Sequence, residues 1–385
     1  LGAGTLRIET NAALGAGTVT AAGGQLDTSA PLTLANNVAL TNTLGLGASG
    51  NALTLTGTLA GAGGVNKTGT GTLALNGANT FAGGTTLASG TLQLGSASAL
   101  GTGGLNVTGA SNLSSSAPLT VANGISLGGP LNWTGAQALT LSGAINGGGS
   151  LIKSGAGDLT LTGNNAYTGG TSLSTGRLVV GSNAALGTGT LTASGGELDA
   201  IAAATLGNTI ALTGSLGVGS SGNALNLSGA IGGTGALTKL GTGSLTLGGL
   251  NTYAGGTNLT AGTLQVASGT ALGTGALNVT GNAALQNTAA TSLSNAIALT
   301  PGALTLSGAQ ALTLSGAISG TGSLIKSGSG DLTLSGNNLY SGGTTLSAGT
   351  LTVGSDTALG VGALSAAAGT TLANATVSTL SKDRK

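Results

Sequence analysis

The sequence of 385 residues contains no cysteine, no histidine and no methionine. Without thiol or imidazole groups, the chain lacks the side chains of thiol and imidazole catalysis and the usual ligands of zinc and iron sites. It has no disulfides, and acidic clusters of the kind that bind calcium are missing. We therefore expect no metal ion and no cofactor.

Charge is equally scarce. Nine basic and eight acidic residues give a formal net charge of +1. Binding to nucleic acid depends on lysine and arginine side chains that neutralise phosphates, and the sequence contains no basic patch. We expect no nucleic-acid partner.

Long apolar segments are also absent. Although 40% of the residues are hydrophobic, no run of 18 apolar residues occurs, so we expect no transmembrane segment in this chain. No signal peptide is visible at the start. Leu1 aligns with Leu87, halfway through a repeat, and we expect the chain to be a fragment of a longer protein.

What the chain has in abundance is glycine and leucine. Seventy-eight glycines argue against helices, because glycine costs about 1 kcal/mol per helical position relative to alanine. Glycine does not fall at every third position, which excludes collagen. The 64 leucines and the low net charge argue against a disordered chain.

The dominant feature is a repeat of 86 residues. The tripeptide Gly-Gly-Thr begins at Gly83, Gly169, Gly255 and Gly342. A fixed period of this length indicates one structural unit copied in series. We expect a single continuous structure over 1–385. Its units are expected at about 1–60 (partial), 61–146, 147–232, 233–319 and 320–385 (partial). A longer period is also present, because residues 44–69 match residues 216–241 at a shift of 172.

Within each repeat, leucines alternate with polar residues, as in Leu73 with Leu75 and Leu139 with Leu141. Alternation with a period of two predicts short strands with one apolar face. Glycine, asparagine and serine between these runs predict tight turns. Leucines at 73, 92, 113, 139 and 159 suggest four coils per repeat. The sequence therefore predicts an all-β fold, a parallel β-helix (β-solenoid) of about 18 coils, with a β-propeller as the alternative.

The segment 320–353, GTGSLIKSGSGDLTLSGNNLYSGGTTLSAGTLTV, resembles the autotransporter-associated β-strand repeat. The same pattern recurs around residues 61–94, 147–180 and 233–266. The resemblance implies a passenger segment of a Gram-negative protein of type V secretion, folded as a right-handed parallel β-helix. It also implies export across the outer membrane and an extracellular location on the bacterial cell surface.

Two kinds of side chain recur once per repeat and are candidates for structure or for weak multivalent binding. They are Lys67, Lys153, Lys239 and Lys326, together with Phe81, Tyr167, Tyr253 and Tyr340. In the structural interpretation, the lysine covers a turn and the aromatic ring closes a loop over the coil. In the binding interpretation, identical points lie in a row about 19 Å apart, and affinity comes from multivalency. The structural interpretation is favoured.

Acidic residues offer fewer candidates. Asp158 and Asp331 each follow a repeat lysine by five residues, which predicts a local ion pair across a turn. Glu197 and Asp199, two residues apart on a predicted strand, would share a face, and paired carboxylates can cleave glycosides. Two solvated polar positions are the favoured interpretation of this pair.

We therefore expect a structural and adhesive surface stalk that is not an enzyme. Its expected partners are further copies of itself, host or neighbouring cell surfaces, or glycans. The alternatives are a polysaccharide-acting β-helix enzyme, a passive spacer for a domain outside this chain, and an ice-binding protein. The last requires regular threonine arrays that this sequence lacks.

Overall fold

A computed structural model describes residues 1–375 of the chain, so the end of the last predicted repeat unit lies outside the described residues. All regular structure in the described part is β, and the strands form a parallel β-solenoid of about 18 coils, as the sequence predicts. The chain divides into two compact units, Leu1–Leu191 (unit 1) and Thr192–Lys385 (unit 2). Each unit is described by itself.

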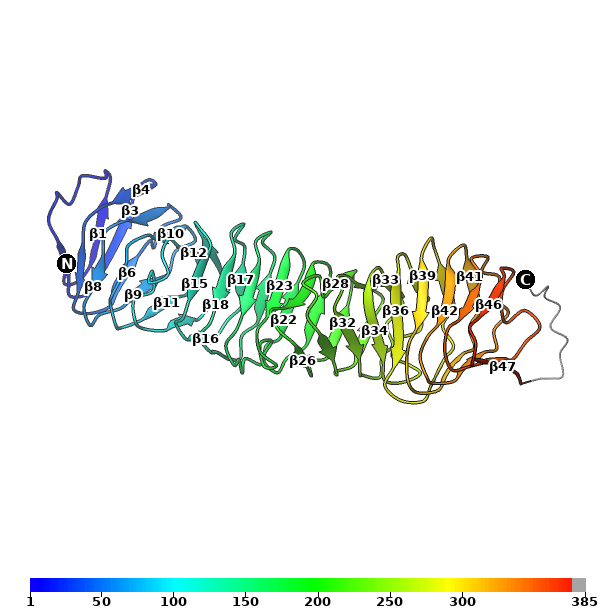
Figure 1. The fold of residues 1–385 in the computed structure, drawn as a ribbon. Coiled ribbons are helices and arrows are strands. Elements are labelled where there is room, and N and C mark those ends of the chain that lie inside the picture. Colours follow the sequence, from blue (N-terminus) through cyan, green and yellow to red (C-terminus); the bar gives the residue numbers. More distant parts are fainter. Residues whose placement is uncertain (376–385) are drawn as a thin grey trace. The chain divides into compact units, whose positions relative to one another are not determined.

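Unit 1 consists of short strands stacked in parallel on three faces (Figure 1). Each coil contributes one strand or one turn to each face. The first face is formed by β1 (Thr5–Ile8), β3 (Gln25–Thr28), β6 (Leu44–Leu46), β9 (Val65–Lys67), β11 (Thr85–Leu87), β13 (Leu105–Val107), β16 (Ile125–Leu127) and β19 (Ile145–Gly147). The second is formed by β4 (Leu32–Leu34), β7 (Leu53–Leu55), β10 (Thr72–Leu75), β12 (Gly90–Leu94), β14 (Ser111–Ser115), β17 (Leu131–Trp133), β20 (Leu151–Lys153) and β22 (Thr171–Leu173). The third is formed by β2 (Val19–Ala21), β5 (Val38–Leu40) and β8 (Leu59–Ala60), and farther along by β15 (Leu119–Val121), β18 (Leu139–Leu141), β21 (Leu159–Leu161) and β23 (Arg177–Val180). Strand β24 (Leu191–Ala193) contains the boundary between the units.

Unit 2 is built in the same way. One sheet contains β25 (Glu197–Ala200), β28 (Leu216–Val218), β31 (Leu237–Lys239), β33 (Thr257–Leu259), β35 (Leu277–Val279), β38 (Ile297–Leu299) and β41 (Ile318–Gly320). Another contains β26 (Ala204–Leu206), β29 (Leu225–Leu227), β32 (Ser244–Leu247), β34 (Gly262–Val266), β36 (Ala283–Asn287), β39 (Ala303–Leu306), β42 (Ser323–Lys326), β44 (Thr344–Leu346) and β46 (Leu364–Ala366). The remaining strands are β27 (Ile210–Leu212) with β30 (Ile231–Gly233), and β37 (Thr291–Leu293) with β40 (Leu312–Leu314), β43 (Leu332–Leu334), β45 (Thr350–Val353) and β47 (Thr371–Asn374).

The leucines of the Leu-x-Leu pattern line the interior of each coil. Leu73 lies in parallel register with Leu92, and both side chains are fully buried. In most strands the residue between two inward side chains, such as Thr140 in β18, is partly exposed, although Ala74 in β10 is buried. Stacking places many of these leucines on an apolar residue of the next coil, as with Leu73 on Leu92 and Leu139 on Leu159, which removes their surface from water.

The predicted four coils per repeat are confirmed, but two of the leucines expected to mark them, Leu139 and Leu159, lie on another face. In register, Leu92 pairs with Leu113, Leu113 with Trp133, and Trp133 with Lys153. Four coils from Leu73 therefore end at Lys153, while Leu139 lies on another face between Leu119 and Leu159. The last six residues, 154–159, carry the chain onward to β21, which belongs to the third face.

Within one repeat the chain thus completes four coils and then runs along one more face, so the next repeat begins on a different face. Unit 2 shows the same relation, since four coils from Leu245 end at Lys326 and the equivalent Leu332 lies in a different sheet. Corresponding residues of consecutive repeats therefore lie on different faces of the coil. No described residue belongs to a helix long and apolar enough to cross a membrane.

Candidate functional site

The four repeat lysines are buried inside the coil. Each occupies the last position of its strand, and the exposed fraction of each residue is at most 2%. Each ammonium group donates a hydrogen bond to the carbonyl oxygen two residues farther along the chain, those of Gly69, Gly155, Gly241 and Gly328. Three of them also reach a carbonyl oxygen of the next coil, as in Lys153 Nζ to Thr175 O at 3.0 Å. The lysine satisfies carbonyl groups at a corner where the strand ends.

Glycine is required opposite this ammonium group. Gly176 has φ of +67°, a conformation that side chains rarely adopt, and a Cβ atom there would collide with Lys153 Nζ and with backbone carbonyl oxygens. Burial of the ammonium group lowers the pKa of Lys67 to about 8. Burial also lowers the pKa of Lys153 and of Lys326, partly opposed by the negative charges of Asp158 and Asp331.

The aromatic residues are also enclosed. Phe81, Tyr167, Tyr253 and Tyr340 each have an exposed fraction of 0%. The Tyr167 hydroxyl lies 2.6 Å from Thr171 Oγ1, and Tyr253 has the same contact with Thr257. Burial raises the pKa of Tyr167 and of Tyr253 to about 12, against a smaller lowering by the threonine hydrogen bond.

These positions bear on the two interpretations of the recurring residues. A ligand in solution cannot contact side chains that have almost no exposed surface. In unit 1, Lys67 lies in the first sheet and Lys153 in the second, so the lysines do not form a row on one face. The geometry therefore favours the structural interpretation for both sets.

Sequence reasoning missed a third recurring residue, an asparagine two positions before each aromatic. Asn165 accepts a hydrogen bond from Ile145 N at 2.8 Å and donates one to Ala185 O at 2.6 Å. The same pair of bonds is made by Asn79, Asn251 and Asn338. The asparagine amide thus links the backbones of the preceding coil and the following coil, at a corner where the asparagine itself is not part of a strand. Its phase with the aromatic residues was the available sequence signal.

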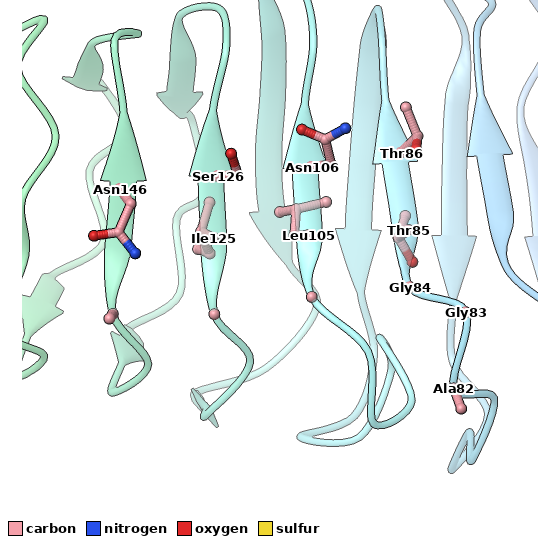
Figure 2. A pocket seen from close by; sticks show the side chains of 13 residues that line it. Ala82, Gly83, Gly84, Thr85, Thr86, Leu105, Asn106, Ile125, Ser126 and Asn146 are labelled. Atoms are coloured by element: carbon pink, nitrogen blue, oxygen red, sulfur yellow. The ribbon is translucent and has the colours of Figure 1, made fainter.

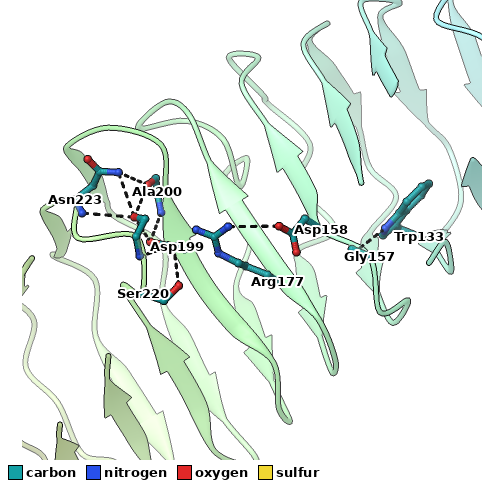
Figure 3. Close-up of polar contacts among 9 residues, drawn as sticks. Trp133, Gly157, Asp158, Arg177, Asp199, Ala200, Ser220 and Asn223 are labelled. Atoms are coloured by element: carbon teal, nitrogen blue, oxygen red, sulfur yellow. Dashed lines mark hydrogen bonds and ion pairs between the residues drawn. The ribbon is translucent and has the colours of Figure 1, made fainter. Parts of the chain in front are cut away.

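The acidic residues do not make the contacts that the sequence suggested. Asp158 pairs with Arg177 at 3.4 Å, whereas the Lys153 ammonium binds carbonyl groups (Figure 3). The predicted local ion pair with the lysine is therefore wrong for Asp158. Both side chains of the Asp158–Arg177 pair are about a third exposed or more.

The carboxylates of Glu197 and Asp199 differ in environment. Asp199 is 1% exposed, and its oxygens accept hydrogen bonds from Ser220 Oγ at 3.1 Å, Ser221 N at 2.9 Å and Ser221 Oγ at 2.7 Å (Figure 3). Glu197 is half-buried. Asp199 therefore stabilises the turn of the following coil, through the Ser221 backbone amide and the hydroxyl groups of Ser220 and Ser221. In the earlier copy of this corner, Asp27 accepts a hydrogen bond from Ser49 N at 2.9 Å.

Trp133 belongs to the core. Its ring is 1% exposed in β17, and Nε1 lies 3.4 Å from Gly157 O (Figure 3). No group of three or more acidic side chains that could hold a metal ion occurs within residues 1–375.

An open groove lies on the first face of unit 1, with a volume of about 540 Å³ (Figure 2). One side is a column of polar side chains that follow each other in register across β11, β13, β16 and β19. These are Thr86, Asn106, Ser126 and Asn146. The other side is a column of small residues, one per coil, at the start of each strand. These are Gly84, Gly104, Gly124 and Ala144. No charged residue lines the groove.

The repeats are similar to repeats of known proteins. The profile of the passenger-associated-transport-repeat family matches four segments, 65–94, 151–180, 237–266 and 324–353. Each contains one lysine, one asparagine and one aromatic residue of the recurring sets. The chain is also similar to a protein named adhesin BmaC autotransporter from Brucella suis biovar 1 (strain 1330), with 38% identity over 106 residues. That alignment covers 26% of this chain and 3% of the Brucella protein. No solved structure matches.

The repeats recur in phase through both units, and the resemblance noted from the sequence agrees with the family match. The chain carries four passenger-associated-transport repeats, and these repeats together with the similarity to an autotransporter adhesin indicate export to the bacterial cell surface.

Proposed function

We propose that this segment is an architectural and adhesive part of its passenger, which holds neighbouring parts of the protein at the cell surface and contributes weak contacts with other cells or with further copies of itself. The observation that carries the proposal is the distribution of side chains. The recurring lysine, asparagine and aromatic residues are buried in the coil, so they serve the architecture. The outward positions are mostly uncharged threonine, asparagine and serine.

Low charge supports contact between like surfaces. The whole chain has 17 charged residues and a net charge of +1, so two copies experience little electrostatic repulsion. Weak contacts repeated along many coils add up through multivalency. The adhesin name of the similar Brucella protein supports the same proposal.

The test is display of this chain on bacteria that do not adhere, compared with the same cells carrying only the membrane anchor. We expect faster sedimentation of the cells or stronger attachment to host cells. Equal behaviour of both strains would reduce the role to a passive spacer. The enzyme alternative gains no support from Asp199, because its carboxylate is buried and bound by serines.

A further inference from the structure

We propose that the groove on the first face of unit 1 binds a neutral glycan chain. The inference rests on the proposed adhesive function and names the chemical class of its ligand. The groove crosses four coils, and its polar column repeats once per coil, at about 4.8 Å. It therefore offers a line of equivalent contacts about 14 Å long, which suits a polymer better than a compact molecule.

The polar column has unused hydrogen-bonding capacity. Asn106, Ser126 and Asn146 are exposed, and within residues 1–375 their side chains make no hydrogen bond. Each amide supplies two donors and one acceptor, and each hydroxyl supplies both. In Figure 2 these side chains stand in one row across adjacent strands. Such a row complements the hydroxyl groups along the edge of a sugar chain.

The small-residue column supplies the other half of the recognition. Gly84, Gly104 and Gly124 leave the groove side without side chains, so a sugar ring can place its C–H face against the backbone. A Cβ atom at Gly124 would meet only Ala144 O, at 3.8 Å, so the space above this position is open, whereas one at Gly84 or Gly104 would lie 2.8 or 3.1 Å from the carbonyl oxygen of the next glycine in the column.

The lining has no charged side chain, which favours a neutral ligand over an anionic one. An anionic polysaccharide or a phosphate-rich polymer would need basic side chains, and none lines the groove. No aromatic ring is exposed there to stack on a sugar. We therefore expect weak binding per site, with dissociation constants in the millimolar range, where roughly 4 kcal/mol is gained.

The later copy of the same positions in unit 2 provides a natural comparison. At a shift of 172, Gly104, Gly124 and Ser126 are replaced by Ala276, Ala296 and Ala298. In that copy the amides bond to each other, since Asn278 Nδ2 donates to Asn258 Oδ1 at 3.0 Å and Asn258 Nδ2 donates to Thr238 Oγ1 at 3.3 Å. Methyl groups of Ala276 and Ala296 occupy two positions of the glycine side, and the amide groups of Asn258 and Asn278 donate within the polar row. The difference makes the unit 1 copy the one built to bind.

This comparison supplies the variant for the test. The triple substitution G104A/G124A/S126A gives unit 1 the residues that unit 2 already tolerates at equivalent positions. Binding of the intact chain to cellohexaose and maltohexaose, with a hexameric galacturonate as the anionic probe, is measured by titration followed by NMR. We expect both neutral probes or one of them to bind, and the triple variant to bind at least tenfold more weakly with an unchanged circular dichroism spectrum.

If the triple variant fails to fold, N106A/N146A replaces it, because both side chains are exposed and make no hydrogen bond within the described residues. No binding of either neutral probe at millimolar concentration would overturn the proposal. Equal binding by the wild type and the variant, or stronger binding of the anionic probe, would do so as well.

Cell display separates this inference from the proposed function. Adhesion that survives the triple substitution leaves the proposed function intact and removes the groove from it. Glycan binding by the purified chain without adhesion of the displaying cells would support the groove as a glycan site and contradict the adhesive function.

Discussion

The Tyr167 hydroxyl lies 2.6 Å from Thr171 Oγ1, and both groups are buried. In the first repeat the corresponding residues are Phe81 and Thr85. Phenylalanine has no hydroxyl, so the buried Thr85 Oγ1 has no hydrogen-bond partner. The first repeat therefore carries an unsatisfied polar atom that the other three repeats satisfy.

This difference predicts opposite effects of one substitution. Thr171→Val leaves the tyrosine hydroxyl unpaired and should destabilise its coil by about 1–3 kcal/mol. Thr85→Val removes an atom that is already unpaired and should be neutral or stabilising. Urea denaturation with hydrogen exchange read at each coil measures both. A loss of equal size at Thr85 would show that its hydroxyl is satisfied in solution.

The complementary change is Phe81→Tyr. The added hydroxyl can reach Thr85 Oγ1 as in the other repeats, so we expect a gain of about 1 kcal/mol in the free energy of unfolding. Thr85→Val in the Phe81→Tyr background should abolish the gain. A destabilised Phe81→Tyr protein would mean that the corner of the first repeat lacks the room for a hydroxyl.

The bridging asparagine predicts a second matched pair. Asn165→Ala leaves Ile145 N and Ala185 O unpaired inside the protein, and each buried unsatisfied group costs about 1–3 kcal/mol. Asn164→Ala, one residue earlier and exposed, should change stability by less than about 0.5 kcal/mol. Thermal unfolding of the two variants is the measurement. Similar melting temperatures would contradict the bridging role.

The buried lysine predicts a loss of stability when its amino group, and with it the hydrogen-bond donors, is removed. Lys153→Met keeps the apolar stem but removes the donor to Thr175 O and leaves Gly155 O with only the long bond from Thr175 Oγ1 at 3.5 Å, which should destabilise the corner by about 2 kcal/mol. Arg177→Met removes a cation from a largely solvent-accessible pair with Asp158 and should cost less than about 1 kcal/mol. If the lysine substitution were the milder of the two in urea denaturation, the ammonium group would not be stabilising the turn.

The same groups set the dependence of stability on pH. The pKa of Lys67 is about 8 when folded and 10.5 when unfolded, so the unfolded chain holds more protons in this window and stability rises with pH between these values. The pKa of Tyr167 and Tyr253 is about 12 when folded and 10.0 when unfolded, so stability falls as the pH rises from 10 to 12. We expect maximal stability near pH 10.

Urea midpoints from pH 7 to 12 check this maximum. Lys67→Met should flatten the rise below pH 10, and the double variant Tyr167→Phe, Tyr253→Phe should reduce the fall above it. A midpoint that declines steadily from pH 8 would contradict the burial of the lysine ammonium groups.

Much of the fold could be predicted because its rules are local. Alternation of leucine with polar residues places one side chain in and the next out, and the glycine-rich turns end each strand after two to five residues. The resemblance to passenger repeats could also be recognised in the sequence, from the recurring lysine, aromatic and Gly-Gly-Thr positions.

The arrangement of the repeats around the coil was decided by tertiary structure. Leu73 stacks on Leu92, 19 residues later, whereas Leu92 stacks on Leu113, 21 residues later, because the corners take up different numbers of residues. An error of one or two residues per coil accumulates over a repeat, and it changes the face on which Leu159 lies.

The sequence by itself determined that short strands coil in series with leucine inside, because side-chain alternation depends only on neighbouring residues. Only the tertiary structure decided that Lys153 is buried, since the carbonyl group that completes its binding site comes from Thr175 in the next coil. It likewise decided that Thr86, Asn106, Ser126 and Asn146 stand in one row, because residues 20 apart become neighbours only when the backbone of each coil hydrogen-bonds to the next.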